Sequence, residues 1–290
     1  MRPAQIKNRV AKTAHMTAWM RTLARLTAGQ DLANTDHLAE RFLLPHQRWL
    51  NRAPHLTRWL TESAYPGGIG YFNARTRYFD DQLKQEAASG LEQLVLLGAG
   101  FDTRPIRFAA QLAGTRTFVV DMPQVLRLRA EHLASLYSPG PVVDVPVDFA
   151  VDDLGAALLA HGYDASARTL FLWEGVTYYL SLAAVEGVLA SIAALTHEGS
   201  GIGFDYVTQA FFDGDYSSYG SKNAAAGWRR LGNVNLSGVH DVAELVRPHG
   251  FRLRCEITPS ELEQRYLVQL PGRALKSWGC FRIAHVERAC

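Results

Sequence analysis

The amino-acid sequence predicts an α/β protein built on a mostly parallel sheet. Between about Leu94 and Val207, short apolar runs alternate with helical stretches, a pattern typical of repeated βα units. Before this region the pattern is only helical, and after it two further strand-like runs follow. The composition, 48% hydrophobic and 20% charged, is that of an ordinary globular chain, so we expect a sizeable core.

The N-terminal part predicts helices and no strand. From Ala4 to about Leu60, apolar residues recur three and four positions apart. The sequence AYPGGIGY at residues 64–71 ends this segment, because proline and several glycines do not favour a continuing helix. We therefore expect a helical cap or lid over residues 1–66 and a second unit over residues 67–290. A helix from about Tyr71 to Ala88 leads into the second unit.

The alternating region predicts five buried parallel strands joined by helices. The expected strands are Leu94–Leu97, Thr117–Val120, Val142–Val147, Thr169–Trp173 and Ile202–Val207. The expected helices lie near residues 105–112, 124–136, 153–161 and 182–195. Sheets of this kind bind ligands outside the carboxyl ends of their strands, so the residues that end these strands are candidates for a binding site.

The C-terminal part predicts a helix over residues 239–249, then strands in FRLRCEI and in the final CFRIAHVE. Two late strands of this kind indicate an antiparallel addition at the sheet edge. Residues 208–237 mix aromatic, polar and glycine residues, as loops that cover a substrate often do. An irregular surface insertion explains this composition equally well.

Composition excludes several classes of partner. A net charge of +2 gives no electrostatic footprint for nucleic acid, and no run of about 18 apolar residues predicts a membrane span. The three cysteines, Cys255, Cys280 and Cys290, lack the spacing of a zinc site. We therefore expect reduced thiols in a cytoplasmic protein without a metal, with no nucleic-acid or membrane partner. The sequence leaves the oligomeric state open.

The first expected strand ends in a glycine loop, within LVLLGAGFDTR. Gly98 and Gly100 let the backbone approach a ligand, but Thr103 stands where a dinucleotide fingerprint has its third glycine. Asp121 ends the next strand, 23 residues after Gly98, where a carboxylate accepts hydrogen bonds from ribose hydroxyls. The alternatives are ordinary turn glycines and an Asp121 that caps the helix begun by Pro123.

Two further acids end the following strands. Asp148 and Phe149 are suited to hold an adenine, through its amino group and its face. The alternative for Asp148 is a helix cap or a solvated turn. Glu174 follows the apolar run LFLW, and an acid at the end of a buried strand favours a cationic or hydrogen-bonding ligand. Together these features indicate an adenosine that carries a positive centre.

The series NARTRYFDD, LVLLGAGFDTR, VVDMP, VDF and WEGVTYYL, in that order, resembles the leucine carboxyl methyltransferase family of S-adenosylmethionine-dependent enzymes. The resemblance covers roughly Val10 to Leu195 and is greatest to the actinobacterial branch that includes polyketide carboxyl methyltransferases. It implies the class I methyltransferase (Rossmann-like) fold, with a seven-stranded, mostly parallel sheet whose last strand is antiparallel. It also implies S-adenosylmethionine as cofactor and S-adenosylhomocysteine as product.

The resemblance implies roles for individual residues. Arg75 matches the family residue that pairs with the methionine carboxylate. The alternative is a surface ion pair with Asp80 or Asp81. The other implied cofactor contacts are Gly98, with Gly100 in the same loop, beneath the cofactor, Asp121 at the ribose, Asp148 and Phe149 at the adenine, and Glu174 near the methionyl part.

The reaction expected from this resemblance is O-methylation of a carboxylate on a small molecule, such as a polyketide or another secondary metabolite. A carboxylate is already nucleophilic at neutral pH, so no general base is required and no catalytic residue is assigned. Tyr206 and His240 are candidates to face the acceptor, though His240 is more simply a helix-end or core histidine. The alternatives are methylation of a protein C-terminal carboxylate, methylation of a small-molecule hydroxyl or nitrogen, and a non-catalytic nucleoside-binding module.

Overall fold

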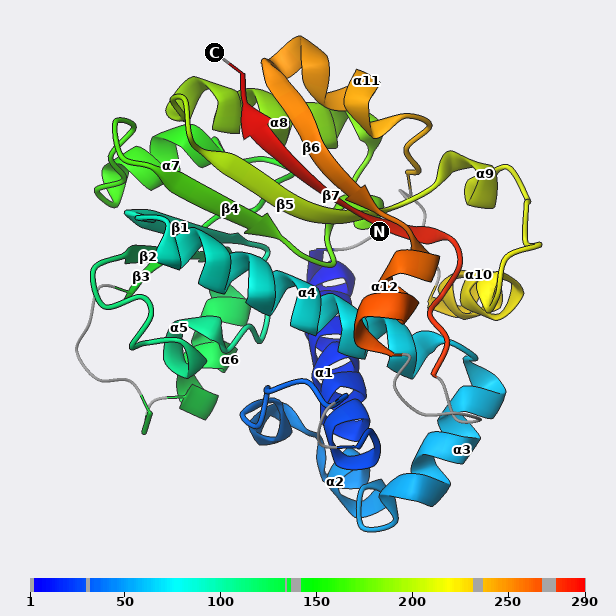
Figure 1. Cartoon of the computed structure of the whole chain (residues 1–290). Coiled ribbons are helices and arrows are strands. Elements are labelled where there is room, and N and C mark those ends of the chain that lie inside the picture. The colour runs from blue at the N-terminus through cyan, green and yellow to red at the C-terminus, as the bar shows by residue number, and fades with distance from the viewer. Residues whose placement is uncertain are drawn as a thin grey trace.

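A single seven-stranded sheet organises the chain in the computed structural model, which describes residues 3–29, 32–133, 135–136, 142–231, 237–267 and 275–289 (Figure 1). The strands are β1 (Gln93–Leu97), β2 (Arg116–Asp121), β3 (Val142–Pro146), β4 (Thr169–Trp173), β5 (Gly201–Val207), β6 (Phe251–Ile257) and β7 (Phe281–Arg288). The first five agree with the predicted strands to within one residue at each end.

The strand order across the sheet is β3-β2-β1-β4-β5-β7-β6. Strands β1 to β5 pair in parallel, whereas β7 runs antiparallel to both of its neighbours, β5 and β6. The predicted fold class, with its antiparallel last strand, is confirmed. Strands β2 and β3 lie on one side of β1, and the next strand along the chain, β4, lies on its other side. The order of strands therefore reverses between β1 and β4, and sheets of this kind bind ligands at the carboxyl ends of the strands at such a switch point.

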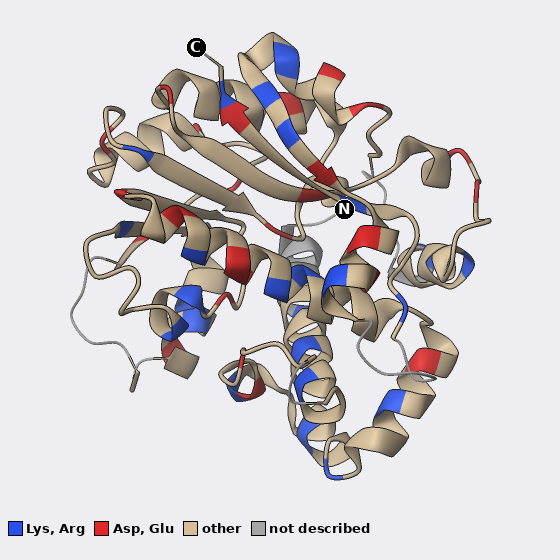
Figure 2. Ribbon diagram, viewed as in Figure 1, with Lys and Arg blue, Asp and Glu red and all other residues tan. Residues whose placement is uncertain are grey.

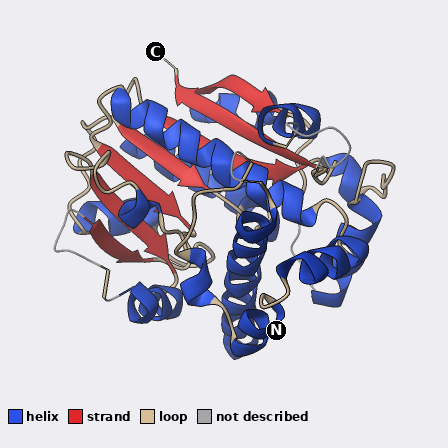
Figure 3. Cartoon of the chain, turned by 60° about the horizontal axis from the view of Figure 1, so that its bottom comes forward, coloured by secondary structure: helices blue, strands red, loops and turns tan. Residues whose placement is uncertain are grey.

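Helices cover both faces of the sheet (Figure 3). The predicted cap, residues 1–66, contains α1 (Pro3–Thr27), α2 (Pro45–Leu50) and α3 (Pro54–Ala64). The remaining helices are α4 (Gly68–Ala88), α5 (Arg104–Arg107), α6 (Pro123–Leu133), α7 (Leu154–Ala160), α8 (Leu182–Leu195), α9 (Gln209–Phe212), α10 (Ser221–Leu231), α11 (Val242–Val246) and α12 (Pro259–Tyr266). Among the residues described, no helix is long and apolar enough to cross a membrane.

Each face of the sheet has its own apolar core. Leu94 and Leu96 of β1 pack with side chains of α1, α4 and α12, whereas Val95 and Leu97 pack with side chains of α7, α8 and α11. This division follows from the pleat, because successive side chains of a strand point to opposite faces. Every residue of β1, β4 and β5 is buried, as expected for central strands that helices cover on both faces.

The boundary of α4 differs from the prediction. The helix begins at Gly68 instead of Tyr71. Only residues 65–67 therefore separate α3 from α4. Gly67, the residue before the helix, has φ +87°, a left-handed conformation that lies outside the helical range and favours glycine. Gly70 lies inside the helix for another reason: a Cβ there would be 2.1 Å from the carbonyl oxygen of Lys276. This glycine allows close backbone packing and does not break the helix.

Two other helices are shorter than predicted. The expected helix at residues 105–112 is reduced to α5, and the expected helix at residues 239–249 begins only at Val242 and ends in a 3₁₀ turn, Arg247–His249. Asp241 explains the late start of α11, because its side chain caps the backbone N–H groups of the first turn.

The cap is joined to the sheet unit through buried amides of α4. The side-chain oxygen of Asn73 accepts hydrogen bonds from the backbone and side-chain nitrogens of Asn34, both at 3.0 Å. Its side-chain nitrogen donates to the carbonyl of Leu32 at 2.7 Å. Because Asn73 is completely buried, these bonds fix the loop after α1 against α4.

Of the predicted thiols, Cys255 and Cys280 are free in the part of the chain that the structure describes. Cys290 lies outside it, as do residues 232–236 of the predicted covering segment.

We predict that Gly70→Ala destabilises the protein by about 1–3 kcal/mol, because the added methyl group overlaps a backbone carbonyl that cannot move alone. Gly187→Ala is the matched control. Gly187 also lies in a helix, but nothing stands within 4 Å of its added Cβ, so this change should stabilise by up to about 1 kcal/mol. Urea denaturation of both variants measures the difference, and equal stability of the two would contradict the packing argument.

Candidate functional site

A cavity of about 430 Å³ opens at the carboxyl ends of the parallel strands. Its walls are the glycine loop after β1, the segments that follow β2, β3 and β4, and residues from α1, α4 and α5. This is the switch point of the sheet, and the volume is in the range of small-molecule sites. The arrangement therefore fits an extended small ligand lying across several strand ends.

All of the residues predicted to bind a cofactor line this cavity, namely Arg75, Gly98, Gly100, Asp121, Asp148, Phe149 and Glu174. The two residues predicted to face an acceptor do not line it. The hydroxyl of Tyr206 donates to Glu256 within the sheet, and His240 is exposed immediately before α11.

The glycine loop has the conformation that its composition predicts. Gly98 and Gly100 have φ +61° and +52°, in the left-handed region that favours glycine. A Cβ on Gly98 would be 2.5 Å from a methyl group of Val176, so the loop packs closely against the segment after β4. The two sides of the switch point are thereby held together at the bottom of the cavity.

Asp121 is buried and held by backbone groups. Its two carboxylate oxygens accept hydrogen bonds from the N–H groups of Gly100 at 2.6 Å and Met122 at 2.7 Å. The bond from Gly100 joins this carboxylate to the glycine loop. Burial raises the pKa of Asp121 to about 6, although the two N–H groups lower it. Each oxygen retains a lone pair for a ligand hydroxyl.

Glu174 lies between two buried arginines. Its oxygens are 2.9 Å from Nε of Arg75 and 2.7 Å from Nη1 of Arg104. Burial by itself would raise the pKa of Glu174, but Arg104 and then Arg75 outweigh it and lower the pKa to about 2. Glu174 is therefore a permanent anion in this site and a poor base.

Arg75 is also held by Asp205, which the sequence analysis did not single out. Its Nη1 lies 2.9 Å from Asp205, and Asp205 further accepts bonds from the hydroxyl of Tyr71 and the N–H of Gly175, both at 2.5 Å. Arg75 is buried, so it is not the surface ion pair considered as an alternative. The signal for Asp205 was present in the sequence: an acid inside the apolar strand GIGFDYV requires buried partners.

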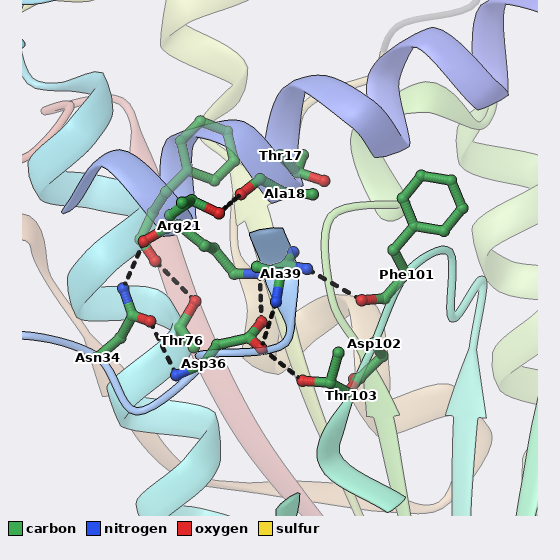
Figure 4. Close-up of polar contacts among 12 residues, drawn as sticks. Thr17, Ala18, Arg21, Asn34, Asp36, Ala39, Thr76, Phe101, Asp102 and Thr103 are labelled. Carbon is green, nitrogen blue, oxygen red and sulfur yellow. Dashed lines mark hydrogen bonds and ion pairs between the residues drawn. The ribbon is translucent and has the colours of Figure 1, made fainter. Parts of the chain in front are cut away.

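A second group of buried charges ties the cap to the glycine loop (Figure 4). Nε of Arg21 in α1 lies 2.8 Å from Asp36, and its Nη2 donates to the carbonyl of Phe101 at 3.0 Å. The hydroxyl of Thr103 donates to the other oxygen of Asp36 at 2.7 Å. Arg21 and Asp36 both line the cavity, so the cap forms part of its wall.

The short helix α5 links these two groups. Arg104 pairs with Asp80 and Asp102 as well as with Glu174, and Arg107 pairs with Asp80 at 2.7 Å. In the described part of the chain, no cluster of histidine, cysteine, aspartate and glutamate could hold a metal ion.

The model of the leucine carboxyl methyltransferase family matches residues 14–193, more than half of the chain. A putative S-adenosyl-L-methionine-dependent methyltransferase from Mycolicibacterium paratuberculosis is 32% identical over 265 residues, covering 83% of this chain and 82% of that protein. Another from Rhodococcus jostii is 33% identical over 238 residues, covering 76% and 78%.

Among solved structures, a DUF574 family protein from Streptomyces avermitilis superimposes with a TM-score of 0.61 at 13% identity, covering 93% of this chain and 96% of that one. An O-methyltransferase family protein from Burkholderia thailandensis gives a TM-score of 0.51 at 14% identity, covering 88% and 73%. At these identities the likeness concerns the fold.

We predict that Asp205→Asn lowers the free energy of unfolding by about 3 kcal/mol, because it leaves Arg75 with one fewer anion in a buried site. Glu244→Gln is the control: its pair with Arg247 is exposed on both sides and should contribute less than about 1 kcal/mol. Chemical denaturation measures both changes. A loss in Asp205→Asn no larger than that of the control would show that the buried pair does not stabilise the fold.

Proposed function

This chain belongs to the leucine carboxyl methyltransferase family and is an S-adenosylmethionine-dependent methyltransferase, and we propose that its acceptor is a carboxylate on a small molecule. A polyketide or another secondary metabolite is the class of acceptor that we favour. The observation that carries the choice of a carboxylate is that Glu174, the acid that we place at the methionyl part, has a pKa lowered to about 2 and is a poor base.

We propose that the cofactor lies across the carboxyl ends of the parallel strands. Adenine would lie at Asp148 and Phe149, the ribose hydroxyls would donate to Asp121, and the methionyl part would lie between Arg75 and Glu174. The groups present suit these partners: Nη2 of Arg75 makes no described hydrogen bond and is available to a carboxylate. When bound, the cofactor supplies an electrophilic methyl group on a positively charged sulfur.

The groups near the proposed methionyl part offer little base catalysis. The described lining residues include no histidine, lysine or cysteine. Glu174 has a pKa of about 2 and is held by two guanidinium groups, so it accepts a proton poorly. Burial raises the pKa of the Tyr179 hydroxyl to about 12, which keeps it protonated. A hydroxyl or ammonium acceptor would need deprotonation, whereas a carboxylate is already ionised and needs none.

Positioning and exclusion of water are then the chain's main contributions. Thr13, Ala14 and Thr17 of α1 line the cavity from the cap side. We infer that residues 1–66 act as a lid and that residues 208–237 support the acceptor side. In support, Trp228 of α10 stacks on Tyr178, next to Tyr179 in the wall. Holding both reactants in line is worth up to about 7–11 kcal/mol of the barrier.

We predict that the protein transfers the labelled methyl group of S-adenosylmethionine to small carboxylic acids and that mild base releases the label, because methyl esters hydrolyse readily. The assay compares matched panels of carboxylic acids, phenols and amines of similar size. Heat-treated protein is the control for uncatalysed transfer. A product that retains its label in base would exclude a carboxylate acceptor and favour an ether or an N-methyl group.

We predict that S-adenosylhomocysteine binds more tightly as the pH rises from about 5 to 7 and that its affinity then levels off. Below a pKa of about 6 the proposed ribose acceptor, Asp121, is protonated, so a proton competes with the ligand hydroxyls. Below the pKa the affinity should change by at most about tenfold per pH unit.

Isothermal titration calorimetry across this pH range measures the effect. Asp121→Asn keeps an oxygen for the N–H of Gly100 but cannot ionise. It should bind more weakly at pH 7 and show no rise between pH 5 and 7. An equal rise in the variant would remove Asp121 from the ligand site.

A further inference from the structure

Helix α3 exposes its apolar face and buries its polar face. Leu56, Trp59 and Leu60 are 57%, 65% and 50% exposed. Thr57 and Thr61, on the opposite face of the helix, are buried against the rest of the cap. A surface helix normally buries its apolar stripe, so this reversed arrangement indicates that the exposed face has a partner.

Trp49, in the neighbouring helix α2, is a further exposed apolar residue, with 66% of its side chain exposed. We call these four residues, Trp49, Leu56, Trp59 and Leu60, the cap ridge. Each of these four side chains is half or more exposed to solvent. The helices beneath the ridge are fixed, because the hydroxyl of Thr57 donates to the carbonyl of Leu50 at 2.6 Å. Arg58 also donates to the carbonyl of Thr27 in α1 at 3.0 Å.

The segment that carries the cap ridge is strongly basic. Residues 41–61 contain four arginines and two histidines and no acidic residue, although the whole chain has a net charge of only +2. Arg41, Arg48 and Arg52 are exposed. The nearest following acid, Glu62, bonds to the N–H groups that start α4. Figure 2 shows mainly Lys and Arg colours over this part of the molecule.

We propose that the cap ridge docks on the surface of an anionic lipid bilayer. Tryptophan and leucine on one side of a helix bury in the boundary between headgroups and acyl chains, and flanking arginines bind lipid phosphates. The sequence analysis expected no membrane partner, because it considered only spanning helices. A peripheral contact of this kind needs no spanning helix.

A lipid surface fits the cap ridge better than a protein does. Two copies related by a twofold axis would place the same arginine-rich segment against itself, which like charges oppose. A protein that held two projecting tryptophans would need matching pockets, whereas a fluid bilayer admits projecting side chains of any shape. The ridge is separate from the cavity, since none of its four residues lines the cavity wall. Docking therefore does not depend on the acceptor proposed above.

The test is co-sedimentation of the full chain with phosphatidylglycerol-containing vesicles and with vesicles of phosphatidylcholine alone. We expect binding to the anionic vesicles, weaker binding at 0.5 M salt, and little binding to phosphatidylcholine. A double variant, Trp59→Ser with Leu60→Ser, should reduce partitioning by about tenfold or more, since it removes two large apolar groups. Arg48→Gln with Arg52→Gln should reduce the salt-sensitive part of the binding.

The matched control is Val151→Ser with Leu159→Ser, two apolar side chains that are 79% and 51% exposed away from the ridge. It should bind vesicles like the unmodified protein, and circular dichroism establishes that all variants are folded. No binding to anionic vesicles, or equal loss in the ridge and control variants, would overturn the proposal. A dimer that size-exclusion chromatography detects and that the ridge variant abolishes, without vesicle binding, would assign the ridge to a second copy instead.

Discussion

A continuous set of buried arginine–carboxylate pairs beneath the cavity is the constraint on which the rest of this structure depends. It begins with Arg21 and Asp36 in the cap, continues through the arginines of α5, and ends at Arg75 and Asp205. Each charge removed from water costs several kcal/mol unless a partner meets it. The partners come from the cap, the glycine loop, α4 and β5, so these parts must assemble together before the cavity exists.

Two carboxylates of the cavity differ in their pKa, because Glu174 belongs to this set of pairs whereas burial dominates at Asp121. Glu174 faces two guanidinium groups, and its pKa is lowered to about 2, so its charge is constant. Asp121 accepts hydrogen bonds from two backbone N–H groups, and burial raises its pKa to about 6. Glu174 therefore balances the charge of the arginines whether or not a ligand is present. The ionised form of Asp121 is stabilised further by a ligand that donates hydrogen bonds.

The sequence predicted a residue's role best where that role depends on the residue's position at the end of a strand. The strands were predictable because parallel strands buried on both faces are continuous apolar runs, and the acids and glycines that end them fall at one edge of the sheet. The ion pairs were not predictable, since Arg75 and Asp205 are 130 residues apart. Tyr206 follows Asp205 by one position, and neighbouring strand residues point to opposite faces, so Tyr206 contacts Glu256 instead of the cavity.

Thr103 shows how one position can exclude one ligand and organise the site for another. In a dinucleotide fold, a glycine at this point lets the helix approach the strand and presents its N-terminus to a pyrophosphate. Here α5 is only four residues long, and the Thr103 hydroxyl bonds to Asp36 in the cap. A glycine would lack that hydroxyl, and Asp36 would lose one of the groups that hold it beside its arginines and the N–H of Ala39. The residue that departs from the dinucleotide pattern is thus one that closes the cap over the glycine loop.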